Sequence, residues 1–183
     1  ADASVAVFAG DWRDVRDVVA VLRTRLGKDL PIDAGIAEIK RKYGVDLMSL
    51  DQLGQRGVET SRGLAVTQVD KVRVFLLPVD APKLFEQYVT VLAKERWDAA
   101  ETSVSRTVGD KSITLFVRAG TDTQKSIGKD DVVMALGFRD RTAILIPGAG
   151  LGAVRGDPEV VLGKLLTLKE GESLKASAGF HHL

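Results

Sequence analysis

A glycine-rich stretch near the C-terminal end has the spacing of a nucleotide-binding motif. In LIPGAGLGAVRGDP (residues 145–158), Gly148, Gly150 and Ala153 match the pattern G-x-G-x-x-A. Such a motif needs a tight strand-to-helix turn that aims the helix N-terminus at a pyrophosphate, and a later carboxylate for the ribose. Here the Asp-Pro pair at 157–158 marks the helix start, beyond the motif, and no second strand follows. The stretch is therefore interpreted as a connecting loop, and no cofactor is predicted.

Two further patterns resemble chemical motifs but lack their context. Ser126 and Lys129 have the S-x-x-K spacing of a serine nucleophile and a lysine, yet the companion motifs K-T-G and S-D-N are absent. Asp122, Asp130 and Asp131 could gather a hard cation, but the alternating acidic pattern of a calcium loop is missing. We interpret this region as a solvated loop and predict no metal site.

Histidine and cysteine usage limits most of the remaining enzyme chemistry. The two histidines, His181 and His182, are adjacent at the C-terminal end, and the chain has no cysteine. A catalytic triad or a histidine zinc site would have to recruit this end of the chain, and thiol chemistry is excluded. Two-carboxylate catalysis needs convergent acids, whereas the glutamates are scattered. We therefore predict no catalytic residue and a protein that is not an enzyme.

The composition is that of one globular domain over residues 1–183. The 183 residues are 45% hydrophobic, which is enough for a proper core without disulfides. Lys and Arg total 26 against 25 Asp and Glu, so the chain lacks the excess of cations that a nucleic-acid partner requires. No apolar run approaches the length that crosses a bilayer. We expect a membrane to be reached only through an anchor that this sequence lacks.

The order of predicted elements gives the fold class. Helical spacing of apolar residues predicts helices over 12–26, 32–43, 50–53, 82–97 and 158–168, the last capped by Asp157. A short strand over 4–9 precedes them. Alternating or continuous apolar runs predict strand pairs 64–69 with 72–79, 101–108 with 112–118, and 132–138 with 142–146. The class predicted is α+β, a mainly antiparallel sheet of hairpins with packed helices.

The strand–strand–helix order occurs twice. A hairpin over 64–78 ends in proline and leads to a helix, and a hairpin over 133–147 does the same after a longer glycine loop. This order is consistent with a duplicated unit. It is equally consistent with chance, because a hairpin followed by a helix is a common arrangement.

Several strands are apolar on both faces, which indicates that both faces of the sheet are covered. The favoured interpretation is a sheet with helices on both faces, or with a helix layer on one face and long loops on the other. The sharper alternative is that one face meets a protein partner, a neighbouring domain or an apolar ligand. The residues predicted for that interaction surface are Phe75, Leu77, Ile144 and Ile146.

Three segments carry a family resemblance: residues 1–12 (ADASVAVFAGDW), 43–66 (YGVDLMSLDQLGQRGVETSRGLAV) and 156–180 (GDPEVVLGKLLTLKEGESLKASAGF). They resemble an uncharacterised domain of exported, periplasmic or lipoprotein chains from myxobacteria and related Gram-negative bacteria. The resemblance implies a periplasmic or outer-membrane-associated location and a longer parent protein, of which this chain is a fragment. It supplies no catalytic residues.

The function expected from these observations is a non-enzymatic cell-envelope module that binds another protein or a neighbouring copy. A first alternative is a carrier of an apolar small molecule or lipid, held between the sheet and helices such as 12–26 or 84–97. A carrier predicts an apolar cavity of roughly 300 Å³ or more. A weaker alternative is a hydrolase, which predicts a cleft with convergent titratable groups and shifted pKa values.

Overall fold

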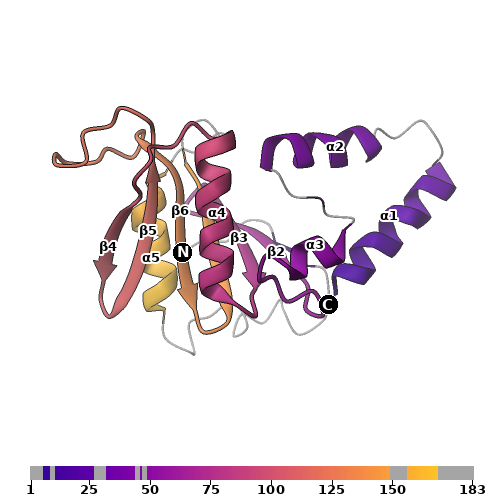
Figure 1. Ribbon diagram of the computed structural model, residues 1–183. Helices are drawn as coiled ribbons and strands as arrows, with labels where there is room; N and C mark the ends of the chain where they lie inside the picture. Colours follow the sequence, from indigo (N-terminus) through magenta and orange to yellow (C-terminus); the bar gives the residue numbers. More distant parts are fainter. Residues whose placement is uncertain are drawn as a thin grey trace.

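The computed structural model describes residues 6–8, 11–26, 32–43, 46, 49–148 and 156–168 (Figure 1). The strands are β1 (Ala6–Phe8), β2 (Ala65–Val69), β3 (Val72–Pro78), β4 (Val104–Val108), β5 (Lys111–Val117), β6 (Val132–Arg139) and β7 (Thr142–Pro147). The helices are α1 (Trp12–Leu26), α2 (Ile32–Tyr43), α3 (Leu50–Gly54), α4 (Pro82–Arg96) and α5 (Pro158–Thr167). The predicted α+β class is confirmed.

The strands form one antiparallel sheet in the order β1-β2-β3-β7-β6-β5-β4. The three predicted hairpins β2–β3, β4–β5 and β6–β7 are all present. In the first of them, Asp70 and Lys71 have φ angles of 48° and 66°, the left-handed pair that matches the twist of a two-residue hairpin. The hairpin β6–β7 then pairs with β3 through β7, which joins the two halves of the sheet.

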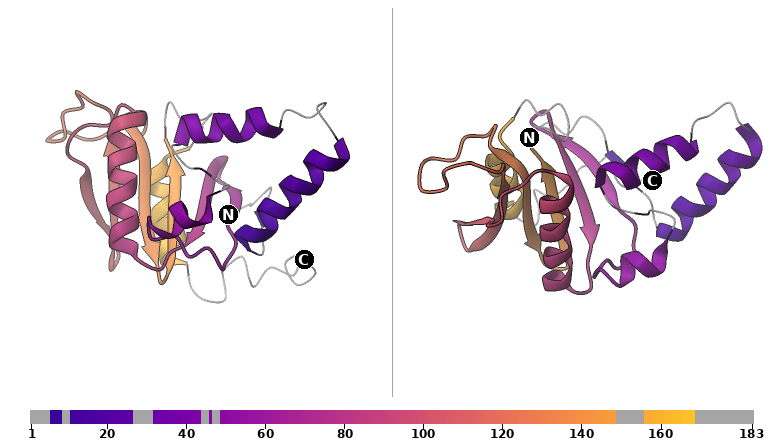
Figure 2. Two further views of the ribbon diagram at one scale, coloured as in Figure 1. Left: turned by 45° about the vertical axis from the view of Figure 1, so that its right-hand side comes forward. Right: turned by 45° about the horizontal axis from the view of Figure 1, so that its top comes forward.

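Helices cover both faces of this sheet, which is one of the two arrangements that the sequence predicts. In Figure 1 helix α4 lies in front of the strands and α5 behind them, and the turned views in Figure 2 agree. Two separate hydrophobic clusters follow from this: α4 packs with Leu136 and Leu145, whereas α5 packs with Ile144 and Ile146. We call these two sides of the sheet the α4 face and the α5 face.

The two strand–strand–helix units differ in the side of the sheet that their helices cover. Strands β2 and β3 lead to α4, and β6 and β7 lead to α5, so the order of elements does occur twice. However, a rotation that superimposes the two hairpins leaves the helices on opposite faces. The likeness therefore extends to the order of the elements and not to their packing.

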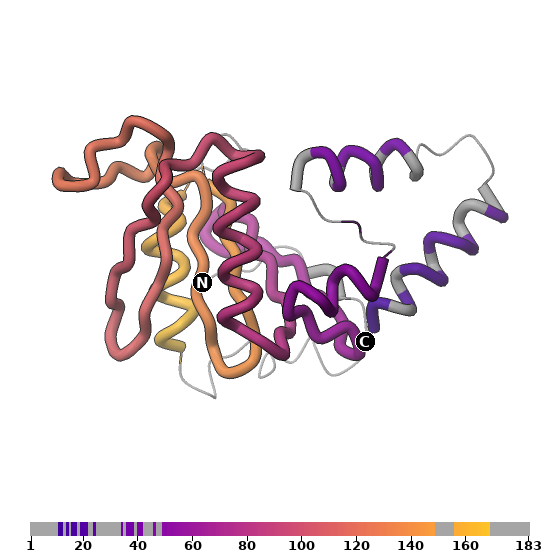
Figure 3. The backbone as a smooth tube through the Cα atoms, viewed as in Figure 1, coloured from indigo at the N-terminus to yellow at the C-terminus, as the bar shows by residue number. Residues whose placement is uncertain are grey.

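The N-terminal helices lie at the β1–β2 side of the sheet, away from β4 (Figure 3). Strand β1 pairs with β2, and Trp12, the first residue of α1, is buried in the cluster on the α4 face. Ser49 directly precedes α3, but its side chain makes no capping hydrogen bond. Burial of Trp12 brings the start of α1 to the α4 face.

Asp157 caps α5, as the sequence predicts. Its carboxylate accepts hydrogen bonds from the backbone N–H groups of Glu159 (2.9 Å) and Val160 (3.4 Å). We expect Asp157→Ala to lower the free energy of unfolding by about 1 kcal/mol, since two helix N–H groups lose their acceptor. Urea unfolding followed by circular dichroism measures this. Asp157→Ser, which keeps an acceptor oxygen, should retain most of the stability; an equal loss would contradict the capping role.

Candidate functional site: a half-open apolar cavity

A cavity of about 340 Å³ lies on the α4 face of the sheet. Its floor comes from strands β2, β3, β6 and β7, and its walls come from α3, α4 and the first residue of α1. Its lining side chains are apolar or aromatic apart from Arg73, which is the charged residue among them. The arrangement is a half-open pocket rather than a flat surface.

The residues of the cavity floor share one side of the sheet because successive side chains of a strand point to opposite faces. On β3, Arg73, Phe75 and Leu77 alternate with residues of the α5 face and so point to the same side. Val66 on β2 pairs with Phe75, and Leu145 on β7 pairs with Phe75 from the other side. The floor is therefore a row of cross-strand neighbours centred on Phe75.

Strand β6 extends the floor through Met134, which pairs with Pro147 on β7, and a β-bulge lies beside it. Phe116 pairs with Met134 and Val117 with Val132, so that the pairing register shifts by one residue. Because of this shift, Val133 and Met134 both pack in the cluster on the α4 face. Met134 lines the cavity in regular alternation with Leu136, and the bulge adds Val133 to the α4 face.

Helix α4 supplies one wall through residues spaced by three and four positions. Phe85, Tyr88, Val89 and Leu92 line the cavity, and Trp97 lines it just after the helix end. The rings of Phe85 and Tyr88 have centroids 6.4 Å apart and are tilted by 56°. This stripe is the buried side of the helix, so the wall is part of the packed core.

Helix α3 and the segment after it supply a second wall through Leu53 and Val58. The segment is fixed to the end of β3, since Val58 bridges to Val79 and the Glu59 N–H donates to the Pro78 carbonyl at 3.0 Å. Gly57 has a left-handed backbone (φ 83°). Because glycine has no Cβ, the segment can lie close to its neighbours at this position.

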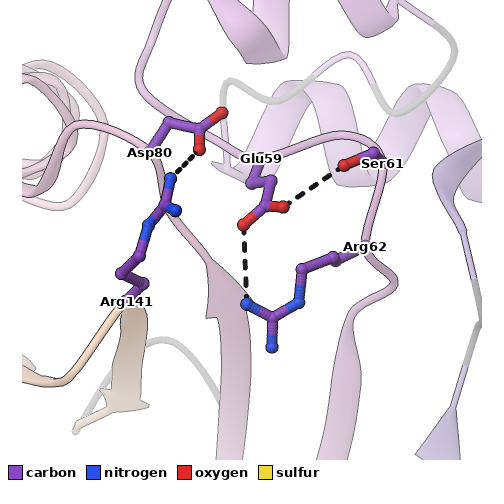
Figure 4. Close-up of polar contacts among 5 residues, drawn as sticks. All are labelled: Glu59, Ser61, Arg62, Asp80 and Arg141. Atoms are coloured by element: carbon purple, nitrogen blue, oxygen red, sulfur yellow. Dashed lines mark hydrogen bonds and ion pairs between the residues drawn. The ribbon is translucent and has the colours of Figure 1, made fainter.

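Polar contacts outside the cavity hold this end of the sheet together (Figure 4). The Glu59 carboxylate accepts hydrogen bonds from Ser61 (3.2 Å) and Arg62 (3.5 Å), and Asp80 pairs with Arg141 on the β6–β7 turn. Asp80 lies two residues before α4, and the residue directly before the helix is Ala81. The Asp80–Arg141 pair joins two segments that are distant in sequence, whereas the Glu59 contacts are local.

Trp12 closes the cavity from the α1 side. Only 1% of its surface is exposed, and it lies in the cavity wall. Its indole Nε1–H is buried and has no hydrogen-bond partner among the residues that the structure describes. A buried donor without an acceptor costs free energy, so the wall of the cavity contains an unused hydrogen-bonding group.

Tyr88 and Arg56 form the polar edge of the α4 wall. Burial raises the pKa of the Tyr88 hydroxyl, with Arg56 and Arg96 acting in the opposite direction. The Arg56 guanidinium lies 4.5 Å from the ring centroid and donates to the hydroxyl at 3.3 Å. The phenol consequently stays protonated at neutral pH, and the Arg56 charge rests on an aromatic face.

The four residues predicted for an interaction surface do not share one face, so this prediction is wrong in part. Phe75 and Leu77 lie half-buried in the cavity floor on the α4 face. Ile144 and Ile146 are 4% and 0% exposed under α5, on the other face. The reason is the register: Ile144 pairs with Leu76, not with Phe75 or Leu77.

The loop with Ser126 and Lys129 is confirmed as irregular structure. Its acidic residues are engaged within the loop: Asp122 accepts a hydrogen bond from the Gln124 N–H, and Asp131 accepts one from the Gly128 N–H. Among the described residues there is no cluster of three or more potential metal ligands. Gly150, Ala153, His181 and His182 lie outside the described residues.

Sequence reasoning missed the contribution of Arg73 to the cavity. The signal was present, because Arg73 has the same strand phase as Phe75 and Leu77 and is charged in an otherwise apolar row. Sequence reasoning did name helices 12–26 and 84–97 as walls of a carrier, and Trp12 and the α4 residues do line the cavity.

Comparison of the chain with protein-family models, curated proteins and solved structures gives no match. The resemblance to exported proteins therefore stays a prediction. Within the described part of the chain, each helix is too short or too polar to cross a membrane.

Proposed function

We propose that this protein binds an apolar small molecule or a lipid chain in the cavity on the α4 face. The observation that carries the proposal is the half-open apolar cavity of about 340 Å³ between the sheet, α3, α4 and Trp12. Its volume lies within the range of small-molecule sites, roughly 300–1,000 Å³, near the lower end. A ligand of modest size is the occupant that such a space favours.

The chemistry of the lining supports the same proposal. Phe75, Leu77 and Leu145 form an apolar floor, and a ligand that covers them removes apolar surface from water. Apolar walls with few polar groups are typical of small-molecule sites.

The protein-binding module expected from the sequence stays a prediction. The surface on which it rested is divided between two faces, and Ile144 and Ile146 are buried under α5. A protein partner would need a different surface. The location in the periplasm or at the outer membrane rests on the family resemblance, and we retain it as a proposal.

Binding of a neutral apolar dye tests the proposed function. We expect N-phenylnaphthylamine, whose fluorescence rises in apolar surroundings, to bind one molecule per folded chain with micromolar affinity. Decanol should displace it competitively. A titration by fluorescence, with native mass spectrometry to count bound molecules, measures both. Failure of the dye and of decanol to bind the folded protein would overturn the proposal.

A further inference from the structure

The cavity floor ends in one unpaired cation. Arg73 lines the cavity and is exposed, which places it at the opening. Within the described part of the chain its guanidinium has neither an ion-pair nor a hydrogen-bond partner. Other arginines near the cavity are engaged: Arg56 with Tyr88, and Arg141 with Asp80. Arg73 is thus the available charged group of the lining.

The position of Arg73 relative to the apolar floor is fixed by the strand. Arg73 pairs with Gln68 near the β2–β3 turn, and Phe75 and Leu77 follow it on the same side of β3. Arg73 and Leu77 are four residues apart on the strand, which corresponds to about 13 Å, so the floor is a row of about that length with the cation at one end and apolar side chains along the rest. An apolar floor with a cation at one end matches a molecule that has an apolar chain and a negatively charged head.

We propose that the ligand is a single-chain amphiphile with an anionic head, whose head binds Arg73 and whose chain lies along Phe75 and Leu77. This inference rests on the proposed function. A guanidinium binds carboxylate and phosphate oxygens in a bidentate manner, and an apolar boundary strengthens that attraction relative to water. The modest cavity volume of about 340 Å³ favours one chain over two.

The test compares decanoate with decanol, which have chains of equal length and differ in head charge. Isothermal titration at neutral pH should show that the wild-type protein binds decanoate about tenfold more tightly, as a charge-assisted hydrogen bond at a partly exposed site provides. Arg73→Gln should remove this preference, so that decanoate and decanol bind the same variant with similar affinity. Arg73→Lys should restore part of it. Decyl phosphate shows whether the phosphate or the carboxylate head is preferred.

Arg106 provides a matched control. It is also an exposed strand arginine without a side-chain partner among the described residues, but it lies on β4 and does not line the cavity. Arg106→Gln should leave both affinities unchanged. Equal decanoate and decanol binding, or a preference that survives in Arg73→Gln, would overturn this inference and leave the proposed function standing. Absence of binding by both compounds would overturn the proposed function itself.

Discussion

Replacement of Leu162 by alanine is expected to lower the free energy of unfolding by about 2–5 kcal/mol, the range for a buried leucine that leaves a cavity. Leu162 is fully buried between α5 and the sheet. The contact is close, since a Cβ added to Gly137 on β6 would lie 3.2 Å from the Leu162 Cδ1 atom. The backbone of β6 therefore has little room to close the gap. Urea unfolding monitored by circular dichroism measures the loss.

Val160 gives the matched control on the same helix. It is 52% exposed, so Val160→Ala should change the free energy of unfolding by less than about 0.5 kcal/mol. The cavity lies on the opposite face of the sheet from α5, so the folded Leu162→Ala protein should bind the dye with unchanged affinity. Similar unfolding curves for the two variants would contradict the packing of α5 described above.

The elements of this fold were predictable because their signals are local. The β2–β3 turn at Asp70 and Lys71, the cap at Asp157 and the helical spacing of Phe85 and Leu92 each depend on a few neighbouring residues. The hairpin pairings follow from the turns, since a two-residue turn fixes the register of its strands. This local information was sufficient for the α+β class.

The pairing of β3 with β7 was not predictable in the same way. It joins residues about 70 positions apart in sequence, such as Phe75 and Leu145, and no turn sets its register. Because side chains alternate, an offset of one residue decides whether Ile144 shares a face with Phe75 or lies opposite. The sequence also does not separate the lining of a cavity from a filled core, because both use the same apolar residue types. The position of Trp12 over the α4 face depends on tertiary packing as well.

Replacement of Val66 by tryptophan is expected to weaken binding of the apolar dye by about a hundredfold or more. Val66 is a half-buried residue of the cavity floor that pairs with Phe75. Each ~55 Å² of apolar surface that a ligand no longer buries weakens its binding about tenfold, and a tryptophan side chain itself covers at least ~150 Å². The added indole therefore displaces most of a small ligand. The dye titration measures the change.

A variant at Val91 is the control for Val66→Trp, because Val91 lies outside the cavity. It is 50% exposed on α4 and does not line the cavity, so Val91→Trp introduces the same side chain without filling the space. This variant should bind the dye as the wild-type protein does.

The thermal unfolding midpoint of Val66→Trp should be equal to or above that of the wild type, because the new ring fills a space rather than creating one. Should Val66→Trp fail to fold, Leu64→Trp offers a second half-buried lining position. A folded variant at either position with wild-type affinity would show that the dye binds elsewhere.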